Sequence, residues 1–152
     1  MRLSIAAFLF VITFFFFQPQ HAPVSKLVSE TEEDSSFLFI GDFTDDYGIK
    51  YTINDSVWFQ HPNTKYQIIH WDKKQRCIIA RNIESNPSDA GLYSRIDYIE
   101  FKNMQPFTWG FCYTVYNVES ETLALETIAA NSDNPKKGCN GFPFSRMKKI
   151  IK

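Results

Sequence analysis

From residue 37 onward, short runs of apolar and aromatic residues alternate with polar turn residues about every 8–12 positions. This pattern is typical of all-β barrels and sandwiches, whose short strands are joined by turns rich in Gly, Pro, Asn and Asp. It predicts seven strands before any helix, at residues 37–44, 49–53, 57–60, 65–72, 77–82, 92–101 and 107–117. Because every connection is short, we expect consecutive strands to pair as antiparallel neighbours.

One helix and one further strand complete the predicted fold. The helix is expected at residues 120–131, where Ser120 can cap the first turn. Its apolar stripe would be formed by Leu123, Ala124, Ile128 and Ala129. A last strand at residues 142–150 gives eight strands, enough to close a meander into a barrel without free edges. The predicted fold is therefore an all-β, eight-stranded antiparallel meander barrel with one α-helix before the last strand, forming a single domain at residues 37–152.

The N-terminal residues have a different pattern. After Arg2, an uncharged apolar run at residues 5–17 contains six of the fifteen Phe residues. A basic start and a short apolar core match a secretory signal peptide, whereas a membrane span needs about 20 residues. We predict a signal peptide at residues 1–22, a flexible polar tether at residues 23–36, and export to an extracellular or periplasmic location. An uncleaved anchor is the alternative, because residues 18–23 contain no clean cleavage site.

The composition fits one folded domain and argues against two classes of partner. The 152 residues are 44% hydrophobic and 22% charged, as in an ordinary globular chain. Sixteen Lys and Arg residues against seventeen Asp and Glu residues give a formal net charge of −1. Proteins that bind nucleic acid or anionic membranes carry an excess of basic residues. We therefore expect no nucleic-acid partner, and no stable membrane insertion once the leader is removed.

The three cysteines, Cys77, Cys112 and Cys139, allow three single disulfides in an exported chain, each leaving one thiol. The sequence does not determine the choice. We favour Cys112 with Cys139, because the turn at residues 138–141 has a permissive backbone that can bring a sulfur to a strand. Cys77 follows the pattern of a small buried hydrophobe. No Cys-x-x-Cys pair occurs and the histidines are not at ligand spacing, so neither a metal nor a cofactor is predicted.

The layout resembles that of a known group of barrels. Gly41-Asp42-Phe43 opens the first predicted strand, and Arg146 lies on the last one. With the meander and the single helix, these features resemble the calycin family, the lipocalin and avidin-like barrels. Those barrels open with Gly-x-Trp and pack a late Arg across the Trp. In this chain Phe43 replaces the Trp, and the helix precedes the last strand instead of following it.

A second resemblance concerns three short segments, at residues 93–98, 109–112 and 138–144. They are similar to a group of small exported proteins without an assigned activity. This similarity supports the pairing of Cys112 with Cys139 and implies nothing about chemistry.

The strand predicted at residues 107–117 carries bulky residues at alternate positions. Strand periodicity places on the interior face Phe107, Trp109, Phe111, Tyr113 and Val115. These side chains either line a ligand cavity or pack as a solid core, because side chains alone can fill an eight-stranded barrel. We take Trp109, Phe111 and Tyr113 as candidate walls of a pocket.

Charged residues on the strand at residues 92–101 are candidates for contacting a ligand. Arg95 and Asp97 point the same way, beside Tyr93. If they face inward they must pair or bind a polar group, because a lone buried charge costs several kcal/mol. We favour a structural ion pair. The alternative is that Tyr93, Arg95 and Asp97 orient the polar end of a ligand.

Few residues suggest catalysis or modification. His70 shares a predicted face with Tyr66, Ile68 and Asp72, and His70 with Asp72 or Asp97 is the arrangement that could perform acid–base chemistry. An ordinary half-buried histidine is favoured, because no nucleophile or metal completes the arrangement.

Asn54 begins an Asn-Asp-Ser glycosylation acceptor, which matters only in a eukaryotic host. The basic C-terminal end is expected to be a solvated tail; it carries Arg146, Lys148, Lys149 and Lys152.

The sequence favours three functions, in decreasing order. The first is a secreted, non-catalytic barrel that binds a small apolar or amphipathic ligand in its mouth. The second is an extracellular structural or protein-interaction domain whose interior is filled by side chains. The third is an enzyme that uses His70 with a nearby Asp.

Overall fold

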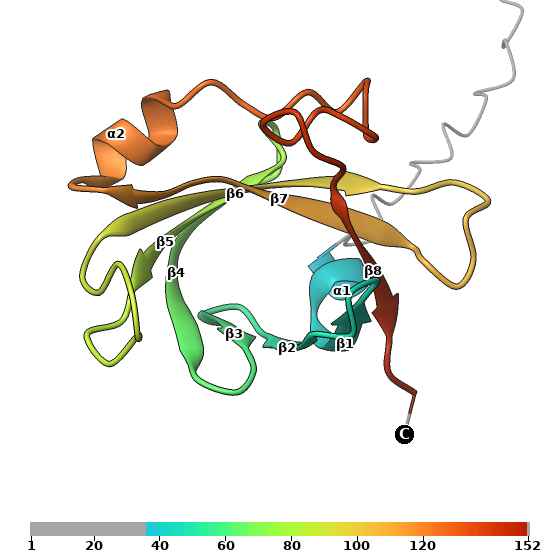
Figure 1. Cartoon of the computed structure of the whole chain (residues 1–152), viewed down its shortest axis with the longest axis horizontal. Helices are drawn as coiled ribbons and strands as arrows, with labels where there is room; N and C mark the ends of the chain where they lie inside the picture. The colour runs from blue at the N-terminus through green and yellow to red at the C-terminus, as the bar shows by residue number, and fades with distance from the viewer. Residues whose placement is uncertain (1–35, 152) are drawn as a thin grey trace, which may run out of the picture. The chain divides into compact units, whose positions relative to one another are not determined.

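The computed structural model describes residues 36–151 and contains a closed β-barrel (Figure 1). The predicted signal peptide and the tether up to residue 35 lie outside the described residues. Each strand pairs antiparallel with the next, and β8 pairs with β1 to close the barrel. The strands are β1 (Gly41–Asp45), β2 (Lys50–Ile53), β3 (Val57–Gln60), β4 (Thr64–Asp72), β5 (Cys77–Asn82), β6 (Tyr93–Glu100), β7 (Trp109–Val118) and β8 (Ser145–Lys149). The predicted fold class is confirmed, including a helix directly before the last strand.

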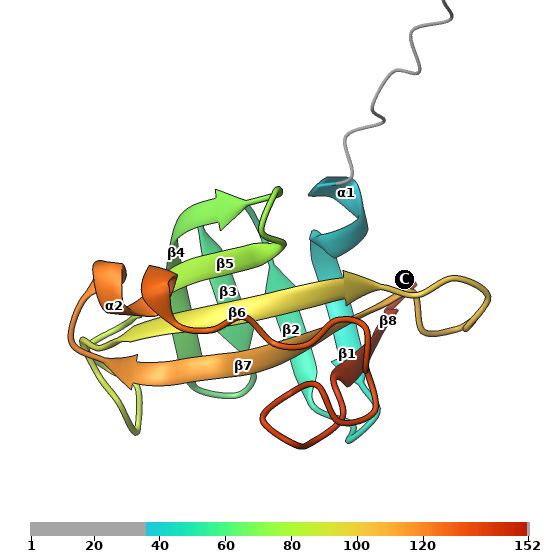
Figure 2. The ribbon, with the colours of Figure 1, turned by 90° about the horizontal axis from the view of Figure 1, so that it is seen from above.

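The start of the barrel differs from the prediction of a strand at residues 37–44. A short helix, α1 (Ser36–Phe39), precedes β1 and lies at one end of the barrel (Figure 2). Phe39 is 2% exposed, and its ring centroid lies 4.6 Å from that of Tyr98 and 5.2 Å from that of Trp109. Burying a large aromatic ring stabilises the fold more than a few extra strand contacts would. The helical turn therefore lets Phe39 close this end.

The second helix is shorter than the predicted residues 120–131. This helix, α2, spans Glu121–Glu126. The Ser120 side chain accepts a hydrogen bond from the Leu123 N–H, as predicted for a cap. Of the predicted apolar stripe, Ala124 is buried, whereas Leu123 is 48% and Ile128 90% exposed. The helix ends early because the chain then crosses β6, where the Ala130 N–H donates to a buried carboxylate. The last strand likewise begins only at residue 145, not at 142.

Aromatic side chains fill the barrel axis. Neighbouring rings contact one another at centroid distances of 4.6–6.3 Å, mostly edge to face. We call this set the aromatic column; it consists of Phe39, Phe43, Tyr51, Trp58, Tyr66, Trp71, Tyr98, Trp109, Phe111 and Tyr113. Edge-to-face pairs are the favoured arrangement of aromatic rings and add stability beyond the burial of their area. The column makes the barrel interior a packed core.

Burial of the column's hydroxyl groups makes stability fall at alkaline pH. Burial raises the pKa of Tyr66, Tyr98 and Tyr113 above its ordinary value of 10.0, and raises that of Cys77 from 9.0 to about 11. Between the ordinary and the raised pKa, the unfolded chain has lost protons that the folded chain still holds, which favours unfolding. We expect the free energy of unfolding to hold up to about pH 9 and to fall above it.

Urea unfolding at a series of pH values measures this effect, with tyrosinate absorbance as the second signal. The buried tyrosines Tyr66, Tyr98 and Tyr113 should ionise only as the barrel unfolds. Ionisation of all tyrosines before unfolding would contradict the packed interior.

A second layer covers the outside of β5, β6 and β7. Figure 2 shows α2 and the chain that follows it crossing these strands. Ala124 of α2 packs against Cys77 and Ile79. Phe144, in the connection between α2 and β8, packs against Ile99 and Cys112. β6 is therefore buried on both faces, which explains why its sequence lacks a simple alternation of apolar and polar residues.

The disulfide predicted between Cys112 and Cys139 is present, with a Cα–Cα distance of 5.4 Å, and is confirmed. It fixes the connection between α2 and β8 to the outside of β7. Cys77 is the free cysteine and is buried. A disulfide is stable in a compartment that is not reducing.

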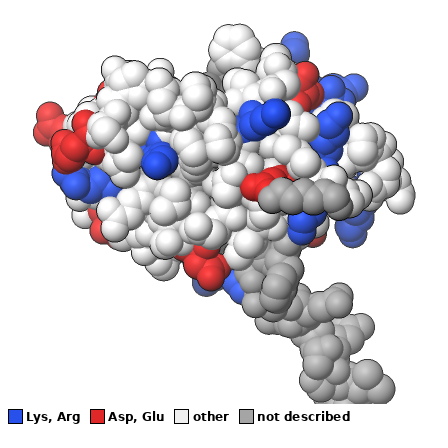
Figure 3. Space-filling model, turned by 90° about the horizontal axis from the view of Figure 1, so that it is seen from below, with Lys and Arg blue, Asp and Glu red and all other residues white. Residues whose placement is uncertain are grey.

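The surface on the side of β1–β3 carries charged side chains of both signs. Figure 3 shows them in separate small groups, near the centre of this face and at its edge, among uncharged residues. Within residues 36–151, neither helix has the length and apolar character needed to cross a bilayer.

Candidate functional site

The candidate pocket residues of β7 belong to the aromatic column. Trp109 is fully buried and Phe111 is 2% exposed, each inside the barrel as the strand period predicts. The Tyr113 hydroxyl donates to Gln60 Oε1 at 3.0 Å. These three residues contact other aromatic rings, so their faces are occupied by protein.

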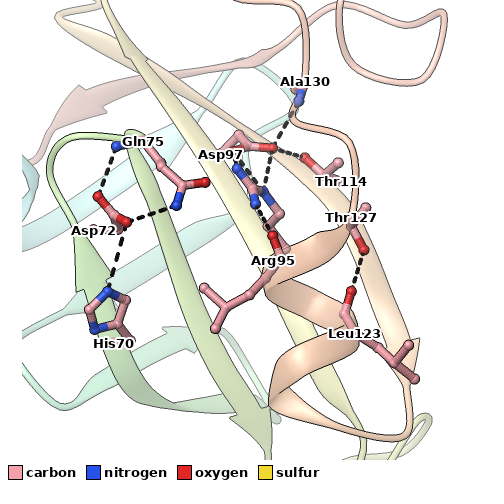
Figure 4. Close-up of polar contacts among 10 residues, drawn as sticks. His70, Asp72, Gln75, Arg95, Asp97, Thr114, Leu123, Thr127 and Ala130 are labelled. Carbon is pink, nitrogen blue, oxygen red and sulfur yellow. Dashed lines mark hydrogen bonds and ion pairs between the residues drawn. The ribbon is translucent and has the colours of Figure 1, made fainter.

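The three polar candidates of β6 lie on the other side of the barrel wall. Arg95 is 1% and Asp97 4% exposed, and both are covered by α2 and the chain after it (Figure 4). Arg95 Nε and Nη2 each lie 3.0 Å from Asp97 Oδ1, and Nη1 donates to the Leu125 carbonyl at 2.9 Å. Asp97 Oδ2 also accepts from the Thr114 hydroxyl and from the Ala130 N–H.

This geometry corrects one part of the sequence interpretation. Tyr93, Arg95 and Asp97 cannot orient a ligand held by Trp109, Phe111 and Tyr113, because the two sets lie on opposite faces of the barrel wall. The protein itself occupies the charged atoms of Arg95 and Asp97. Arg95 and Asp97 form a structural ion pair, which is the alternative that the sequence favoured. The pair connects α2 and the segment after it to β6.

His70 lies on the outer surface of β4. A β-bulge between Ile68 and His70 shifts the register, so that Ile68 and Trp71 pack against the core. The prediction that Tyr66, Ile68, His70 and Asp72 share one face is therefore wrong beyond Ile68. The His70 side chain is 50% exposed, with Nε2 3.9 Å from Asp72 Oδ2. The pKa of Asp72 is lowered, mainly because its carboxylate accepts a hydrogen bond from the Gln75 backbone N–H.

The described residues hold no metal-binding cluster beside this pair. Within residues 36–151, no three His, Cys, Asp or Glu side chains come together at metal-binding distances. Asn54 is exposed in the turn between β2 and β3, and its Oδ1 accepts from the Ser56 and Val57 N–H groups. Its glycosylation stays a prediction.

A polar cluster that the sequence did not indicate lies outside β1, β2 and β3. The Thr52 hydroxyl donates to Asp42 Oδ1 at 2.9 Å and lies 3.0 Å from His61 Nε2. The cluster joins three neighbouring segments of the chain through these two contacts.

An apolar hollow of about 510 Å³ lies on the outside of the barrel. We call it the outer groove. It lies between the β1–β2 turn, the β6–β7 loop, and the connection from α2 to β8. Its lining residues are Asp46, Tyr47, Phe101, Met104, Pro135, Lys136, Pro143, Phe144 and Arg146.

Local contacts hold the outer groove in shape. A side chain at Gly110 would place its Cβ 2.9 Å from the Phe101 ring and from the Ser145 carbonyl oxygen, so glycine lets Phe101 lie against β7. The Phe144 N–H donates to the Pro135 carbonyl at 2.9 Å, closing the connection on itself. The disulfide anchors this connection to β7. The groove walls are therefore fixed by packing, backbone contacts and one covalent link.

Arg146 differs from the position that the calycin resemblance implies. Its guanidinium lies 4.7 Å from the centroid of the Phe107 ring, and its Nε donates to Asp46 Oδ2 at 2.8 Å. Phe43 instead points into the barrel, edge to face with Trp109. Arg146 therefore supports the wall of the outer groove.

The outer groove could not be found from sequence patterns, because its residues meet only through three loops that are distant along the chain. Turn residues signal where loops occur, but they do not show which loops come together. Comparison of the chain with models of protein families, with curated proteins and with solved structures finds no match.

Proposed function

We propose that the mature chain is an exported, non-catalytic protein that binds a small amphipathic ligand with an anionic end in the outer groove. The ligand class is the one that the sequence favours, but the site lies outside the barrel. The packed aromatic column leaves the outer surface as the place for a ligand. The single observation that carries the proposal is the apolar groove of about 510 Å³, within the usual 300–1,000 Å³ of small-molecule sites.

The walls of the groove suit an apolar ligand body. Phe144 is 2% exposed and forms a buried base, while Met104 is 38% and Tyr47 70% exposed at the edges. Two prolines, Pro135 and Pro143, add rigid apolar surface. Covering exposed apolar surface of this type provides the main favourable term in binding.

The charges at the rim favour an anionic ligand end. Asp46 is paired with Arg146, so these two charges largely compensate each other. Within the described part of the chain, Lys136 has no ion-pair partner. The uncompensated charge of the groove is therefore the positive charge of Lys136, which can meet a carboxylate or sulfonate.

We also propose that the chain is exported and that its barrel is related to those of the calycins. The disulfide and the signal-peptide pattern of residues 1–22 both support an oxidising destination. The closed meander of eight strands is compatible with the calycin layout. If the chain is a calycin, it is one in which aromatic side chains occupy the place of an interior ligand.

A fluorescent amphiphile, 1-anilinonaphthalene-8-sulfonate, displaced by dodecanoate, measures binding in the groove. Tyr47→Ala and Met104→Ala are each expected to weaken dodecanoate binding about tenfold, because each removes apolar contact worth about 1.4 kcal/mol. Lys136→Gln should weaken dodecanoate binding severalfold and leave the binding of uncharged dodecanol unchanged.

Two matched substitutions serve as controls. Tyr116→Ala removes a 50% exposed tyrosine outside the groove, and Lys137→Gln removes the neighbouring lysine, which does not line it. Both should bind dodecanoate like the unaltered chain. Equal losses in Tyr47→Ala and Tyr116→Ala would sink the proposal and favour the structural or protein-interaction alternative.

A further inference from the structure

Helix α2 and the segment after it carry large apolar side chains that do not pack into the barrel wall. The helix packs through Ala124, which is buried against Cys77 and Ile79. Leu123 is 48% and Ile128 90% exposed, and Figure 4 shows the Leu123 side chain directed away from β6. Scattered single apolar residues are ordinary on a surface, whereas two large ones close together along the chain mark a candidate contact surface.

The same part of the chain is acidic. Residues 117–135 contain four acidic residues and no basic one. Three of the acidic residues, at positions 119, 121 and 126, flank the exposed apolar ones, and none of these three forms an ion pair with the described residues. We call this surface the α2 face; it consists of Glu119, Glu121, Leu123, Glu126 and Ile128.

The α2 face keeps its negative charge because the cations of the strands beneath it are engaged. The helix contacts β5, β6 and β7, whose basic residues are Arg81 and Arg95. Arg81 Nη2 lies 2.7 Å from Glu84 Oε1, and Arg95 is paired with Asp97 under the helix. Arg76, just before β5, borders a small hollow beside the segment that follows α2, and it is a single charge against three glutamates.

The end of the last strand has the opposite composition. Residues 136–152 contain six basic residues and no acidic one. We call residues 148–151 the β8 end segment; it consists of Lys148, Lys149, Ile150 and Ile151. Neither lysine forms an ion pair with the described residues, and Ile151 is 92% exposed. The segment therefore complements the α2 face both in charge and in exposed apolar side chains.

These two surfaces lie far apart in one molecule. Figure 1 and Figure 2 both show α2 and the end of β8 at opposite sides of the barrel. The Ile150 N–H donates to the Asp42 carbonyl at 2.8 Å, which holds the β8 end segment against β1. The segment therefore cannot reach the α2 face of its own molecule, and a contact between the two requires a second copy.

We propose that the β8 end segment of one copy of this chain binds to the α2 face of a second copy. The lysines meet the glutamates, and Ile151 covers Leu123 and Ile128. Because the two surfaces differ, each pair of copies keeps one free segment and one free face, so further copies can add head to tail. The contact involves few side chains, so it is weak and needs a high protein concentration. It does not depend on ligand binding in the outer groove.

Sedimentation equilibrium of the purified chain, at concentrations up to about 1 mM, tests the proposal. The weight-average mass should rise with concentration and pass the mass of a dimer without levelling off. Raising the salt concentration to about 1 M should lower this mass, because exposed charges are then screened. A chain that stays monomeric at every concentration would overturn the proposal, and a mass that levels off at the dimer would overturn head-to-tail contact.

Charge reversal on each surface identifies the two partners. The double variant Glu121→Lys and Glu126→Lys, and separately the double variant Lys148→Glu and Lys149→Glu, should each weaken self-association at least about tenfold. An equal mixture of the two double variants should associate like the unaltered chain, because opposite charges face each other again. Failure of the mixture to associate, with both variants folded, would overturn the pairing of these surfaces.

Two further variants test the apolar part of the contact against a matched control. Ile151→Ser should weaken self-association about tenfold, since it removes the most exposed apolar side chain of the β8 end segment. Ile69→Ser alters a 43% exposed isoleucine on β4, outside both surfaces, and should associate like the unaltered chain. Equal losses in Ile69→Ser and Ile151→Ser would show non-specific association and overturn the proposed contact.

Discussion

Replacing Asp97 by alanine is expected to lower the free energy of unfolding by about 3–5 kcal/mol, because Arg95 then remains buried without its carboxylate. Arg95 is 1% exposed, so water cannot solvate the remaining charge. The substitution also removes the acceptor of the Thr114 hydroxyl and of the Ala130 N–H. The connection after α2 thereby loses its polar contact with β6.

Urea unfolding measures this loss, and two variants make it specific. Asp46→Ala breaks the exposed pair with Arg146 and should cost no more than about 1 kcal/mol. The double substitution Arg95→Met and Asp97→Leu removes both buried charges and should recover the part of the loss that comes from the unpaired Arg95. A loss in Asp97→Ala as small as that in Asp46→Ala would contradict a structural role for the pair.

Replacing Trp109 by alanine is expected to cost about 3–5 kcal/mol of unfolding free energy. Its fully buried ring lies at centroid distances of 5.2, 5.2 and 5.9 Å from Phe39, Phe43 and Trp58. The substitution removes the centre of the aromatic column. Rings packed this closely can collapse only partly into the space, so a cavity remains and adds to the cost.

The control for Trp109→Ala is Tyr116→Ala, which truncates a half-exposed ring on the outer surface and should change stability by less than about 0.5 kcal/mol. A cost below about 1 kcal/mol for Trp109→Ala would show that the barrel interior is not tightly packed. Folded Trp109→Ala should still bind dodecanoate like the unaltered chain, because Trp109 does not line the outer groove.

Much of the barrel could be predicted because most strands have one buried face. In β7, an alternating pattern placed Trp109 and Phe111 inside and Cys112 outside, and the structure agrees. Turn residues separated the strands well enough to give their number and order. Period-two alternation and short connections are local properties, so one sequence suffices to detect them.

The exceptions have local physical causes. β6 is buried on both faces by the outer layer, so its pattern could not show which way Arg95 points. In β4, a bulge changes the face of every residue after Ile68, and His70 becomes exposed. In α1, closure of the barrel end by Phe39 overrides strand propensity. Each exception depends on a contact with a distant part of the chain.

The candidate sites depend on such distant contacts even more strongly. The outer groove brings together Tyr47, Met104 and Lys136, from three separate loops. The sequence could indicate an amphipathic ligand from the barrel layout, but only the folded chain shows where polar and apolar side chains converge.

Aromatic side chains fill the barrel, and we propose that an amphipathic ligand binds outside it. Proton–nitrogen NMR spectra recorded during addition of dodecanoate test where the ligand binds. We expect shifts of the backbone signals of Tyr47, Met104 and Lys136, with the indole signals of Trp58 and Trp109 unchanged. Shifts of the Trp58 and Trp109 indole signals, with the groove signals unchanged, would place the ligand inside the barrel and rule out binding in the outer groove.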